Sequence, residues 1–583
     1  MNEQIWQNLA AMFFDQARRY GERPFLWKKI SGTYQSSSWN DTAKQVTLLS
    51  RGLIAQGVNK GDRIVLVSEN SPAWLVADLA IISIGAITVP AYTTNTPKDH
   101  LHIINNSGAS GAIISNNKLM EQFFPAALQS NSLNFIITTE KQNISQETNF
   151  NLLSLDEVID QGQNSKNDIV KLTTRLEPDD TTCIIYTSGT GGLPKGVMLS
   201  HRNLLSNCDG ARDCLAELGL DHEVFLSFLP LSHSYEHMVG HFFPMTIGAE
   251  IYYAEGIETL SANMLEARPT IMSAVPRLYE TMHQRITTGV KKAGGLKEKL
   301  FNSTLELGTR QLQSSNRFRP IDRLKNVVLD KLVRDKVRAR FGGRLKALVS
   351  GGAPLNPEIG IFFTALGLRI LQGYGQTETS PVISANRPNN IKLHTVGPPL
   401  KNVDVKIAVD GEILVRGDLV MQGYWNNEIA TRETIKNGWV HTGDIGLIDE
   451  DGHILITDRK KDIIVNSGGD NISPQRVENI LTLEPEIIQA MVYGDKHPHL
   501  VAVIVPDPEW SKEIEESGLS PKKELSHVIG KVNKSLSNIE KVRHHVIANG
   551  PFTTKNDLLT PTMKIRRHKI IEIYGKALNS LYK

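Results

Sequence analysis

Ile184-Ile-Tyr-Thr-Ser-Gly-Thr-Gly-Gly-Leu-Pro-Lys-Gly-Val197 carries a short apolar, β-favouring run into hydroxyl groups and glycines and then into a single lysine, Lys195. Glycines let backbone N–H groups approach phosphate oxygens closely, while the hydroxyls add donors and the lysine adds a positive charge. An ordinary glycine-rich turn is the alternative, but the density of hydroxyls and the closing Pro-Lys-Gly favour a strand followed by a phosphate-binding loop. The Walker A pattern does not fit, because Pro194 precedes the lysine and Gly196 follows it.

Length and composition limit the class of protein. A chain of 583 residues is too long to fold around one ordinary hydrophobic core, so two or more domains are expected. Its hydrophobic content of 40% and charged content of 22% are typical of globular proteins, and its net charge of +2 argues against a nucleic acid or another general polyanion as partner. The three cysteines, Cys183, Cys208 and Cys214, have neither paired metal-ligand spacing nor a disulfide framework, which is typical of a reducing cytosol.

Hydropathy predicts neither a secretory nor a membrane-spanning segment. The N-terminal residues mix charged and apolar side chains in a pattern that predicts an amphipathic helix rather than a signal peptide. The most apolar segment runs from Ala73 to Tyr92, but Asp78, Gly85 and Pro90 interrupt it. A buried helix followed by a strand explains this segment better than a membrane span. We therefore expect a cytoplasmic protein.

Basic residues are concentrated between about residues 285 and 346, where 17 Lys or Arg stand against 5 Asp or Glu. Apolar residues recur there at helical spacing, from Leu324 to Val337, and predict an inserted helical segment. A solvated helical face is one interpretation of this charge. Contact with anionic lipid headgroups is the other, and it predicts peripheral association with the inner face of a membrane.

Short Val/Ile-rich runs alternate with helical patterns through the first half of the chain, beginning with residues 63–68. This alternation predicts an α/β fold with largely parallel sheets. Short strands and Gly-Asp turns between Val403 and Ile456 predict a small β-rich subdomain. We expect a large N-terminal domain of layered α/β sheets over residues 1–457 and a small, mobile C-terminal α+β domain over residues 458–583.

Three further clusters carry groups suited to a nucleotide. Ser350-Gly-Gly-Ala-Pro354 follows a predicted strand and opens a helix, and Tyr374 stands between two glycines where its ring can stack on a planar base. Glu378 supplies a hard oxygen ligand suited to Mg²⁺, with a helix cap as the alternative role. Asp444, in the turn that begins at Thr442, can accept hydrogen bonds from two ribose hydroxyls, with a structural Asx-turn as its alternative.

His233-Ser-Tyr-Glu-His237 offers a rival interpretation, because it matches the H-x-x-E-H pattern of one group of zinc proteases, and His241 continues the spacing. No carboxylate follows at a recognisable distance to complete such a site. The preceding Leu229-Pro-Leu231 also predicts a loop, not the interior of a helix, at His233. The sequence therefore disfavours a zinc centre.

Together these segments resemble the AMP-forming adenylating enzymes, the superfamily of acyl-CoA synthetases, luciferases and peptide-synthetase adenylation domains. The phosphate loop, Tyr374 to Glu378, the Thr442 turn and the C-terminal Pro561-Thr-Met-Lys564 stand in the family's order over nearly the whole chain. Within the superfamily, the run from Asn437 to Asp462 is most similar to the signature of long-chain fatty-acid–CoA ligases.

This resemblance implies an enzyme that uses ATP and Mg²⁺ to convert a long-chain fatty acid to an acyl-adenylate, and then coenzyme A to form acyl-CoA and AMP. Two alternatives stay open: a fatty acyl-AMP ligase that passes the acyl group to a carrier protein, and a synthetase for another carboxylic acid. The presence of both Glu378 and Lys564 speaks against a non-catalytic nucleotide- or lipid-binding relic. Chain length, saturation and oligomeric state stay open.

The resemblance also implies roles for individual residues. Lys564 would bridge the reacting carboxylate and the α-phosphate, Thr190 and Glu378 would lie near Mg²⁺, His233 would border the acyl pocket, and Asp458 would be the hinge between the domains. The residues that would bind ATP or coenzyme A are Thr187, Ser188, Gly189, Thr190, Gly192 and Lys195 at the phosphates, Gly352, Ala353, Gln372, Gly373, Tyr374, Gly375 and Thr377 around adenine and the α-phosphate, Asp444 and Arg459 at the ribose, and Gly468 and Gly469 on the face that binds coenzyme A.

Gly191 is where this chain departs from the family pattern, which usually has Thr or Ser at this position. One hydroxyl contact to the phosphates is therefore missing, and such a hydrogen bond to a charged group contributes about 1–2 kcal/mol. The backbone N–H of Gly191 remains, so we assign no side-chain role to this position.

Overall fold

The computed structural model describes residues 6–139, 148–187, 193–313, 320–560 and 564–582. The chain forms two compact units. The large unit comprises Met1–Lys406, Leu414–His441 and Asp449–Ile454, and the small unit comprises Ile407–Ile413, Thr442–Ile448 and Leu455–Lys583. The small unit thus includes two short segments that precede Asp458, and the hinge at Asp458 stays a prediction.

Eight strands form the first sheet of the large unit. They are β3 (Arg63–Val67), β4 (Ile87–Pro90), β5 (Gly111–Ile114), β6 (Phe135–Thr138), β7 (Asn151–Ser154), β8 (Thr181–Thr187), β9 (Lys195–Ser200) and β18 (Gly423–Tyr424). Their order in the sheet is β18-β9-β8-β4-β3-β5-β6-β7. The pairs from β8 to β7 are parallel, whereas β9 is antiparallel to both β8 and β18. The predicted α/β class is confirmed by this sheet and the next.

The second sheet of the large unit also has eight strands. They are β1 (Pro24–Ile30), β2 (Thr33–Ser38), β10 (Val224–Ser227), β11 (Glu250–Tyr253), β12 (Ile271–Ala274), β13 (Ala347–Ser350), β14 (Ile370–Gly375) and β15 (Val382–Ala385). They follow the order β15-β14-β13-β12-β10-β11-β1-β2. The two outermost pairs, β14–β15 and β1–β2, are antiparallel, and the inner pairs are parallel.

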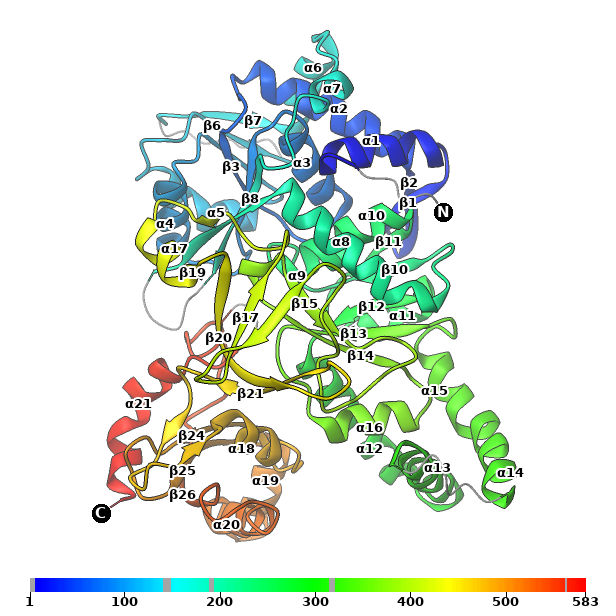
Figure 1. The fold of residues 1–583 in the computed structure, drawn as a ribbon, viewed down its shortest axis with the longest axis vertical. Coiled ribbons are helices and arrows are strands. Elements are labelled where there is room, and N and C mark those ends of the chain that lie inside the picture. Colours follow the sequence, from blue (N-terminus) through cyan, green and yellow to red (C-terminus); the bar gives the residue numbers. More distant parts are fainter. Residues whose placement is uncertain (1–5, 140–147, 188–192, 314–319, 561–563, 583) are drawn as a thin grey trace. The chain divides into compact units, whose positions relative to one another are not determined.

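Helices separate many of the strands of the large unit (Figure 1). Several of them begin at a residue that caps the helix. In the first half they are α1 (Leu9–Tyr20), α2 (Trp39–Ala55), α3 (Pro72–Ser83), α4 (Pro97–Ser107), α5 (Asn117–Ala127), α6 (Leu155–Asn164), α7 (Ile169–Thr173), α8 (His201–Leu215) and the short η1 (Ala216–Leu218). Ser38, Thr96 and Ser154 each precede a helix and form capping boxes with an acidic residue three positions on. Each box satisfies two backbone N–H groups that the helix itself leaves unpaired.

The second half of the large unit holds most of its shorter helices. They are α9 (Ser234–Glu236), the π-helix η2 (His237–Phe242), α10 (Phe243–Ile247), α11 (Leu260–Ala267), α12 (Pro276–Ala293), α13 (Gly295–Gln313), α14 (Pro320–Leu329), the π-helix η3 (Asp330–Arg334), α15 (Asp335–Arg340), α16 (Pro357–Ala365), η4 (Thr377–Thr379) and α17 (Glu428–Thr434). Figure 1 shows α12 to α16 gathered at one end of this unit. The described residues of the basic segment near 285–346 are therefore mostly helical, as the spacing predicts.

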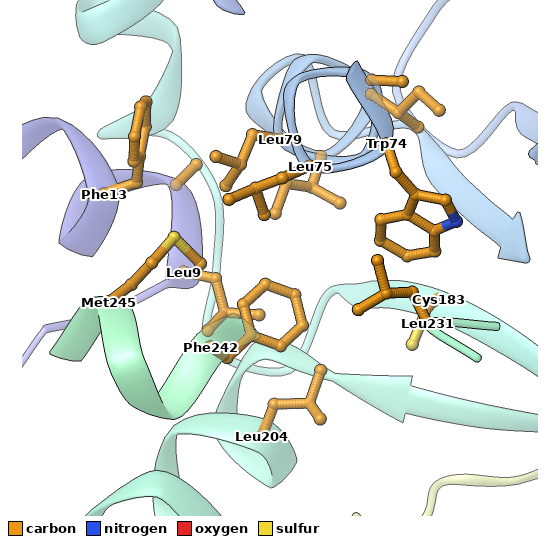
Figure 2. Packing of buried hydrophobic residues seen from close by; sticks show 14 of the residues in the cluster. Leu9, Phe13, Trp74, Leu75, Leu79, Cys183, Leu204, Leu231, Phe242 and Met245 are labelled. Carbon is orange, nitrogen blue, oxygen red and sulfur yellow. The ribbon is translucent and has the colours of Figure 1, made fainter. Parts of the chain in front are cut away.

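The main core of the large unit lies where α1 and α3 meet η2 and α10. Figure 2 shows Leu9 and Phe13 from α1 facing Leu75 and Leu79 from α3, with Phe242 beneath them. All five side chains are at most 1% exposed. The apolar segment that begins at Ala73 is thus a buried helix followed by β4, and within the described residues no helix is both long enough and apolar enough to cross a bilayer.

A small third sheet contains β16 (Asp404–Ile407), β17 (Glu412–Arg416), β19 (Ile435–Lys436), β20 (Trp439–Ile448) and β21 (Ile454–Arg459). Its order is β16-β17-β20-β19, with β21 beside β20. This sheet is the small β-rich subdomain that the short strands and Gly-Asp turns predict.

The part of the small unit that follows Arg459 is an α+β fold around one three-stranded sheet. Its elements are β22 (Ile464–Val465), β23 (Asn471–Ile472), α18 (Pro474–Leu481), β24 (Ile487–Tyr493), β25 (Leu500–Pro506), α19 (Pro508–Glu516), α20 (Pro521–Val532), β26 (Val542–Ile547) and α21 (Arg567–Ser580). Alternate residues of the central strand β25 enter two different cores, Ala502 packing with α18 and α20 and Val503 packing with α21. Both faces of the sheet are therefore covered from within this unit.

His100 of α4 makes stability depend on pH. The side chain is 1% exposed against the ring of Phe123, and burial lowers its pKa to about 4. The unfolded chain, with a histidine pKa of about 6.5, therefore binds more protons than the folded chain between these values. The contribution of neutral His100 to the free energy of unfolding is fully present above about pH 6.5 and is lost as the pH falls toward 4.

Replacing His100 with leucine is expected to reduce the loss of unfolding free energy between pH 7 and pH 5 by about 2 kcal/mol. Urea unfolding of the wild type and of the variant at both pH values measures this difference. The matched control is His394→Leu, because His394 is exposed in the same unit. An equal pH dependence in the wild type and in the His100→Leu variant would contradict the assignment.

Candidate functional site

The β8–β9 hairpin positions the predicted phosphate loop. Thr187 ends β8 and pairs in register with Lys195, the first residue of β9. His102 Nε2 donates a hydrogen bond of 2.8 Å to the carbonyl oxygen of Pro194, which holds the second arm of the loop against α4. Both ends of the loop are thus fixed by strand pairing. Ser188, Gly189, Thr190, Gly191 and Gly192 lie outside the described residues, so their roles stay predictions.

Tyr424 of β18 links the phosphate-loop lysine to the candidate Mg²⁺ ligand. The ammonium of Lys195 lies 4.8 Å from the centroid of the Tyr424 ring. The hydroxyl of the same tyrosine donates a hydrogen bond of 2.8 Å to Glu378 Oε1. Burial and the neighbouring Glu378 carboxylate raise the pKa of Tyr424, so its hydroxyl keeps the proton that it donates. Three residues far apart in sequence therefore form one connected group.

A Tyr424→Phe variant is expected to weaken this group without unfolding it. The phenyl ring still fills the site beside Lys195, but Glu378 loses a donor, and a hydrogen bond to a charged group contributes about 1.5–3 kcal/mol. We expect about a tenfold rise in the Mg²⁺ concentration that half-saturates the adenylation that the resemblance implies. Titration of the reaction with Mg²⁺ at saturating ATP measures it, and an unchanged half-saturation would show that Tyr424 does not position Glu378.

The adenine-binding candidates follow two adjacent parallel strands. β13 ends at Ser350, which pairs with Gln372 of β14, so the segments after both strands leave the same edge of the sheet. Ligands of open α/β sheets bind outside this carboxyl edge. A Cβ at Gly375 would lie 1.8 Å from the carbonyl oxygen of Pro381, which requires glycine there. The predicted adenine-binding residues that these two segments bring together are Gly352, Ala353, Gln372, Gly373, Tyr374, Gly375 and Thr377.

His233 lies next to this edge. Its Nδ1 accepts a hydrogen bond of 3.1 Å from the backbone N–H of Tyr235, and Ser234 Oγ is 3.0 Å from Thr377 Oγ1. The Tyr235 hydroxyl donates to the carbonyl oxygen of Val349, at 2.9 Å, near the end of β13. The loop that carries His233 is therefore tied to both candidate adenine-binding segments, and its place beside the acyl pocket stays a prediction.

The other two histidines of the rival zinc pattern lie in the core. His237 and His241 belong to η2, where His237 Nε2 is 2.9 Å from Asp78 Oδ2 and His241 Nε2 is 2.9 Å from the Tyr253 hydroxyl. Burial lowers the pKa of His241 well below its ordinary value. The two imidazoles thus pair with different partners, and among the described residues no group of three His, Cys, Asp or Glu is arranged to hold a metal ion.

Asp444 and Arg459, the predicted ribose-binding residues, meet in the small unit. Arg459 Nε donates a hydrogen bond of 3.0 Å to Asp444 Oδ1, and Asp444 is only 4% exposed. The backbone N–H of Asp444 donates to Thr442 Oγ1 at 3.1 Å, and Gly443 adopts a positive φ of 72°. The turn is therefore stabilised by the hydroxyl of Thr442, as in an ST-turn, and Asp444 presents a carboxylate that is paired with Arg459.

The remaining predicted residues of the small unit lie in separate loops. Gly468 and Gly469 lie between β22 and β23, and Lys564 is an exposed residue just before α21. The backbone N–H of Thr560 donates to the carbonyl oxygen of Lys564 at 2.8 Å. Burial raises the pKa of Asp458 to about 6.

Sequence reasoning did not find Tyr424. It lies in a Gly-Tyr-Trp run that resembles an ordinary strand, and its two neighbours in the candidate site, Lys195 and Glu378, belong to β9 and η4. The pairing of Gly423 with Met198 places Tyr424 beside the β8–β9 hairpin, and no local sequence pattern predicts that pairing.

Comparison with known proteins identifies the family to which this chain belongs. Residues 13–425 match the AMP-binding enzyme family, and residues 461–583 match the AMP-binding enzyme C-terminal domain. A long-chain-fatty-acid–CoA ligase of Mycobacterium bovis, FadD15, is 33% identical over 99% of this chain and 97% of its own. The peroxisomal long chain acyl-CoA synthetase 6 of Arabidopsis thaliana is 31% identical over 95% of this chain and 82% of its own.

Solved structures agree on the fold. The adenylation domain of a carboxylate reductase from Mycobacterium chelonae superposes with a TM-score of 0.79 at 20% identity, covering 100% of this chain and 92% of that one. The anthranilate CoA ligase AuaEII, in complex with anthranoyl-AMP, gives a TM-score of 0.74 at 19% identity and covers 98% of each chain. With family matches that span most of its length and relatives above 30% identity across nearly all of it, the chain belongs to the AMP-binding, adenylate-forming enzyme family.

Proposed function

We propose that the protein is an AMP-forming long-chain fatty-acid–CoA ligase. It activates a fatty acid with ATP to an acyl-adenylate, releasing pyrophosphate, and then transfers the acyl group to the thiol of coenzyme A, releasing AMP. The observation that carries the proposal is the connected group of Lys195, Tyr424 and Glu378 at the phosphate-loop hairpin. The 33% identity to a long-chain-fatty-acid–CoA ligase over 99% of the chain supports the choice of acid and acceptor.

The chemistry of the first step explains why such a group is needed. A carboxylate is a poor electrophile because its leaving group would be oxide, and attachment to AMP gives it a good leaving group. The carboxylate oxygen attacks the α-phosphorus and the bond to pyrophosphate breaks, so two anions must approach each other. Fixed cations and backbone N–H groups stabilise that approach.

Each candidate residue has a place in this step. Lys195 and the N–H groups of the loop hold the β- and γ-phosphates, and Thr190 and Glu378 bind Mg²⁺. The carboxylate of Glu378 fits this role, because Mg²⁺ prefers hard oxygen ligands, and the bound ion offsets phosphate charge. Asp444 and Arg459 hold the ribose, and Lys564 holds the carboxylate and the α-phosphate together.

The second step uses different residues of the small unit. Asp458 acts as a hinge that exchanges Lys564 for the loop of Gly468 and Gly469, which receives coenzyme A. An added Cβ at Gly469 would meet no atom within 4 Å, but its φ of +86° favours glycine at this open turn. The backbone there is accessible to a ligand.

ATP–pyrophosphate exchange across acids of increasing chain length tests the proposal. We expect exchange with long-chain fatty acids, and release of acyl-CoA when coenzyme A is added. Exchange only with aryl or amino acids would exclude the proposed substrate. An acyl-adenylate that is not consumed by free coenzyme A would point to a carrier protein as acceptor.

We place the enzyme in the cytoplasm, in peripheral contact with the inner face of a membrane. Its partners are the fatty acid, ATP and coenzyme A. A long-chain acid partitions into lipid, so a ligase that works at the bilayer surface meets its substrate at high local concentration. The basic segment near 285–346 supports this placement.

A further inference from the structure

Helix α14 presents an apolar stripe to solvent. Ile321 is 71% exposed, Leu324 68%, Val327 67% and Val328 48%. Their spacing of three, three and one residues places them on one side of the helix. Exposed apolar residues that occur singly are ordinary, but a contiguous set on one ten-residue helix marks a binding surface.

The opposite side of α14 is anchored, which fixes the direction of the stripe. Leu329 is 2% exposed, and Asn326 Oδ1 accepts a hydrogen bond of 2.8 Å from Arg334 Nη1. Arg334 also donates through Nε to the carbonyl oxygen of Ala365 in α16, at 2.7 Å. Because these contacts hold α14 against its neighbours, the apolar stripe faces outward as a stable feature of the fold.

Positive charge borders the stripe. Arg323 and Lys325 lie on either side of it at helical spacing, and Lys331 follows in η3, all three exposed. Between Pro320 and Arg340 seven Lys or Arg stand against three Asp, a net of four positive charges. Asp330 and Asp335 are both paired with Arg338, each at 2.7 Å, so one guanidinium offsets part of their charge.

We propose that α14 docks the protein on the surface of an anionic lipid bilayer. The inference rests on the membrane association of the proposed function and assigns it to one surface. An apolar stripe bordered by Lys and Arg is the pattern of a helix that lies in the interface, with its apolar side toward the acyl chains and its cations among the phosphate headgroups. The charge complementarity selects an anionic lipid surface as the occupant.

A matched pair of substitutions isolates the apolar stripe. Leu324→Ser removes a side chain that is 68% exposed, and Ile257→Ser removes one that is 67% exposed elsewhere in the same unit. Full-length protein is sedimented with phosphatidylcholine vesicles that contain or lack phosphatidylglycerol, with no substrate present. We expect Leu324→Ser to lower partitioning onto the anionic vesicles about fivefold and Ile257→Ser to leave it unchanged.

A second pair isolates the charge. Arg323→Glu combined with Lys325→Glu is expected to lower partitioning onto the anionic vesicles about tenfold or more, and added salt should act in the same direction on the wild type. Lys118→Glu combined with Lys171→Glu reverses two exposed charges elsewhere in the large unit and should have a much smaller effect.

Three outcomes overturn the inference: no vesicle binding by the wild type, equal binding by Leu324→Ser and wild type, or a self-association that Leu324→Ser abolishes in sedimentation velocity without vesicles. The last outcome would assign the stripe to a second copy of the chain.

Ligase assays with detergent-dispersed fatty acid keep the docking proposal and the proposed function apart. Vesicle binding that depends on α14 without ligase activity supports docking and rejects the proposed function. Ligase activity together with vesicle binding that does not depend on α14 supports the proposed function and rejects docking by α14.

Discussion

A Lys564→Ala protein is expected to lose adenylation by about 10²–10³-fold, the cost of removing one group that stabilises charge in a transition state. It should still convert supplied acyl-adenylate and coenzyme A to acyl-CoA, because the proposed role of Lys564 ends with the first step. The substitution keeps the two hydrogen bonds of this position, because Thr560 N donates to Lys564 O and Lys564 N donates to Thr560 Oγ1, and neither uses the lysine side chain.

Two assays on the same preparation separate the half-reactions. ATP–pyrophosphate exchange reports the first, and thioester formation from synthetic acyl-adenylate reports the second. Lys555→Ala is the matched control, because Lys555 is an exposed lysine of the same unit, nine positions earlier. Normal exchange by the Lys564→Ala protein would remove Lys564 from the proposed mechanism, and equal loss of both half-reactions would indicate a structural role.

Replacing Glu378 with glutamine is expected to slow adenylation about 10²-fold and to raise the Mg²⁺ requirement. Glutamine has nearly the same shape, and its carbonyl oxygen can still accept the hydrogen bond that Tyr424 donates to Oε1. The charge is therefore removed while the packing and the hydrogen bond persist, so the loss reports on the carboxylate itself. A charged oxygen ligand is what Mg²⁺ loses in this variant.

Pyrophosphate exchange measured over a range of Mg²⁺ concentrations tests the role of Glu378. If the carboxylate binds the ion, high Mg²⁺ should recover part of the lost rate. Glu358→Gln, at an exposed acid in the first turn of α16, is the control. A rate loss that no Mg²⁺ concentration changes would assign Glu378 a role other than metal binding.

Local patterns in the sequence predict the order of strands and helices and the segments that carry the candidate site. The phosphate-loop strand, the buried helix after Ala73 and the C-terminal α+β fold all rest on runs of a few neighbouring residues. Contacts between residues that are distant in the sequence produce no such local pattern. His237 meets Asp78 across 159 positions, and Tyr424 meets Glu378 across 46, so neither pairing follows from spacing.

The apolar pattern of α14 shows a second limit. Periodicity from Leu324 onward correctly predicts a helix, because it reports that apolar residues share a side. It does not report what covers that side. In the fold, Leu329 turns inward while Leu324 and Val328 stay in solvent, a distinction that depends on where α16 and η3 lie.

The two cores on either side of the β24–β25–β26 sheet draw their residues from Ile464 to Tyr582 alone. A segment that buries its own apolar surface meets the main requirement for folding independently. Residues 461–583 should therefore yield a folded fragment when produced alone, with a cooperative unfolding transition of its own. Such a fragment could be exchanged between relatives as a module, carrying Lys564 and the Gly468 loop with it.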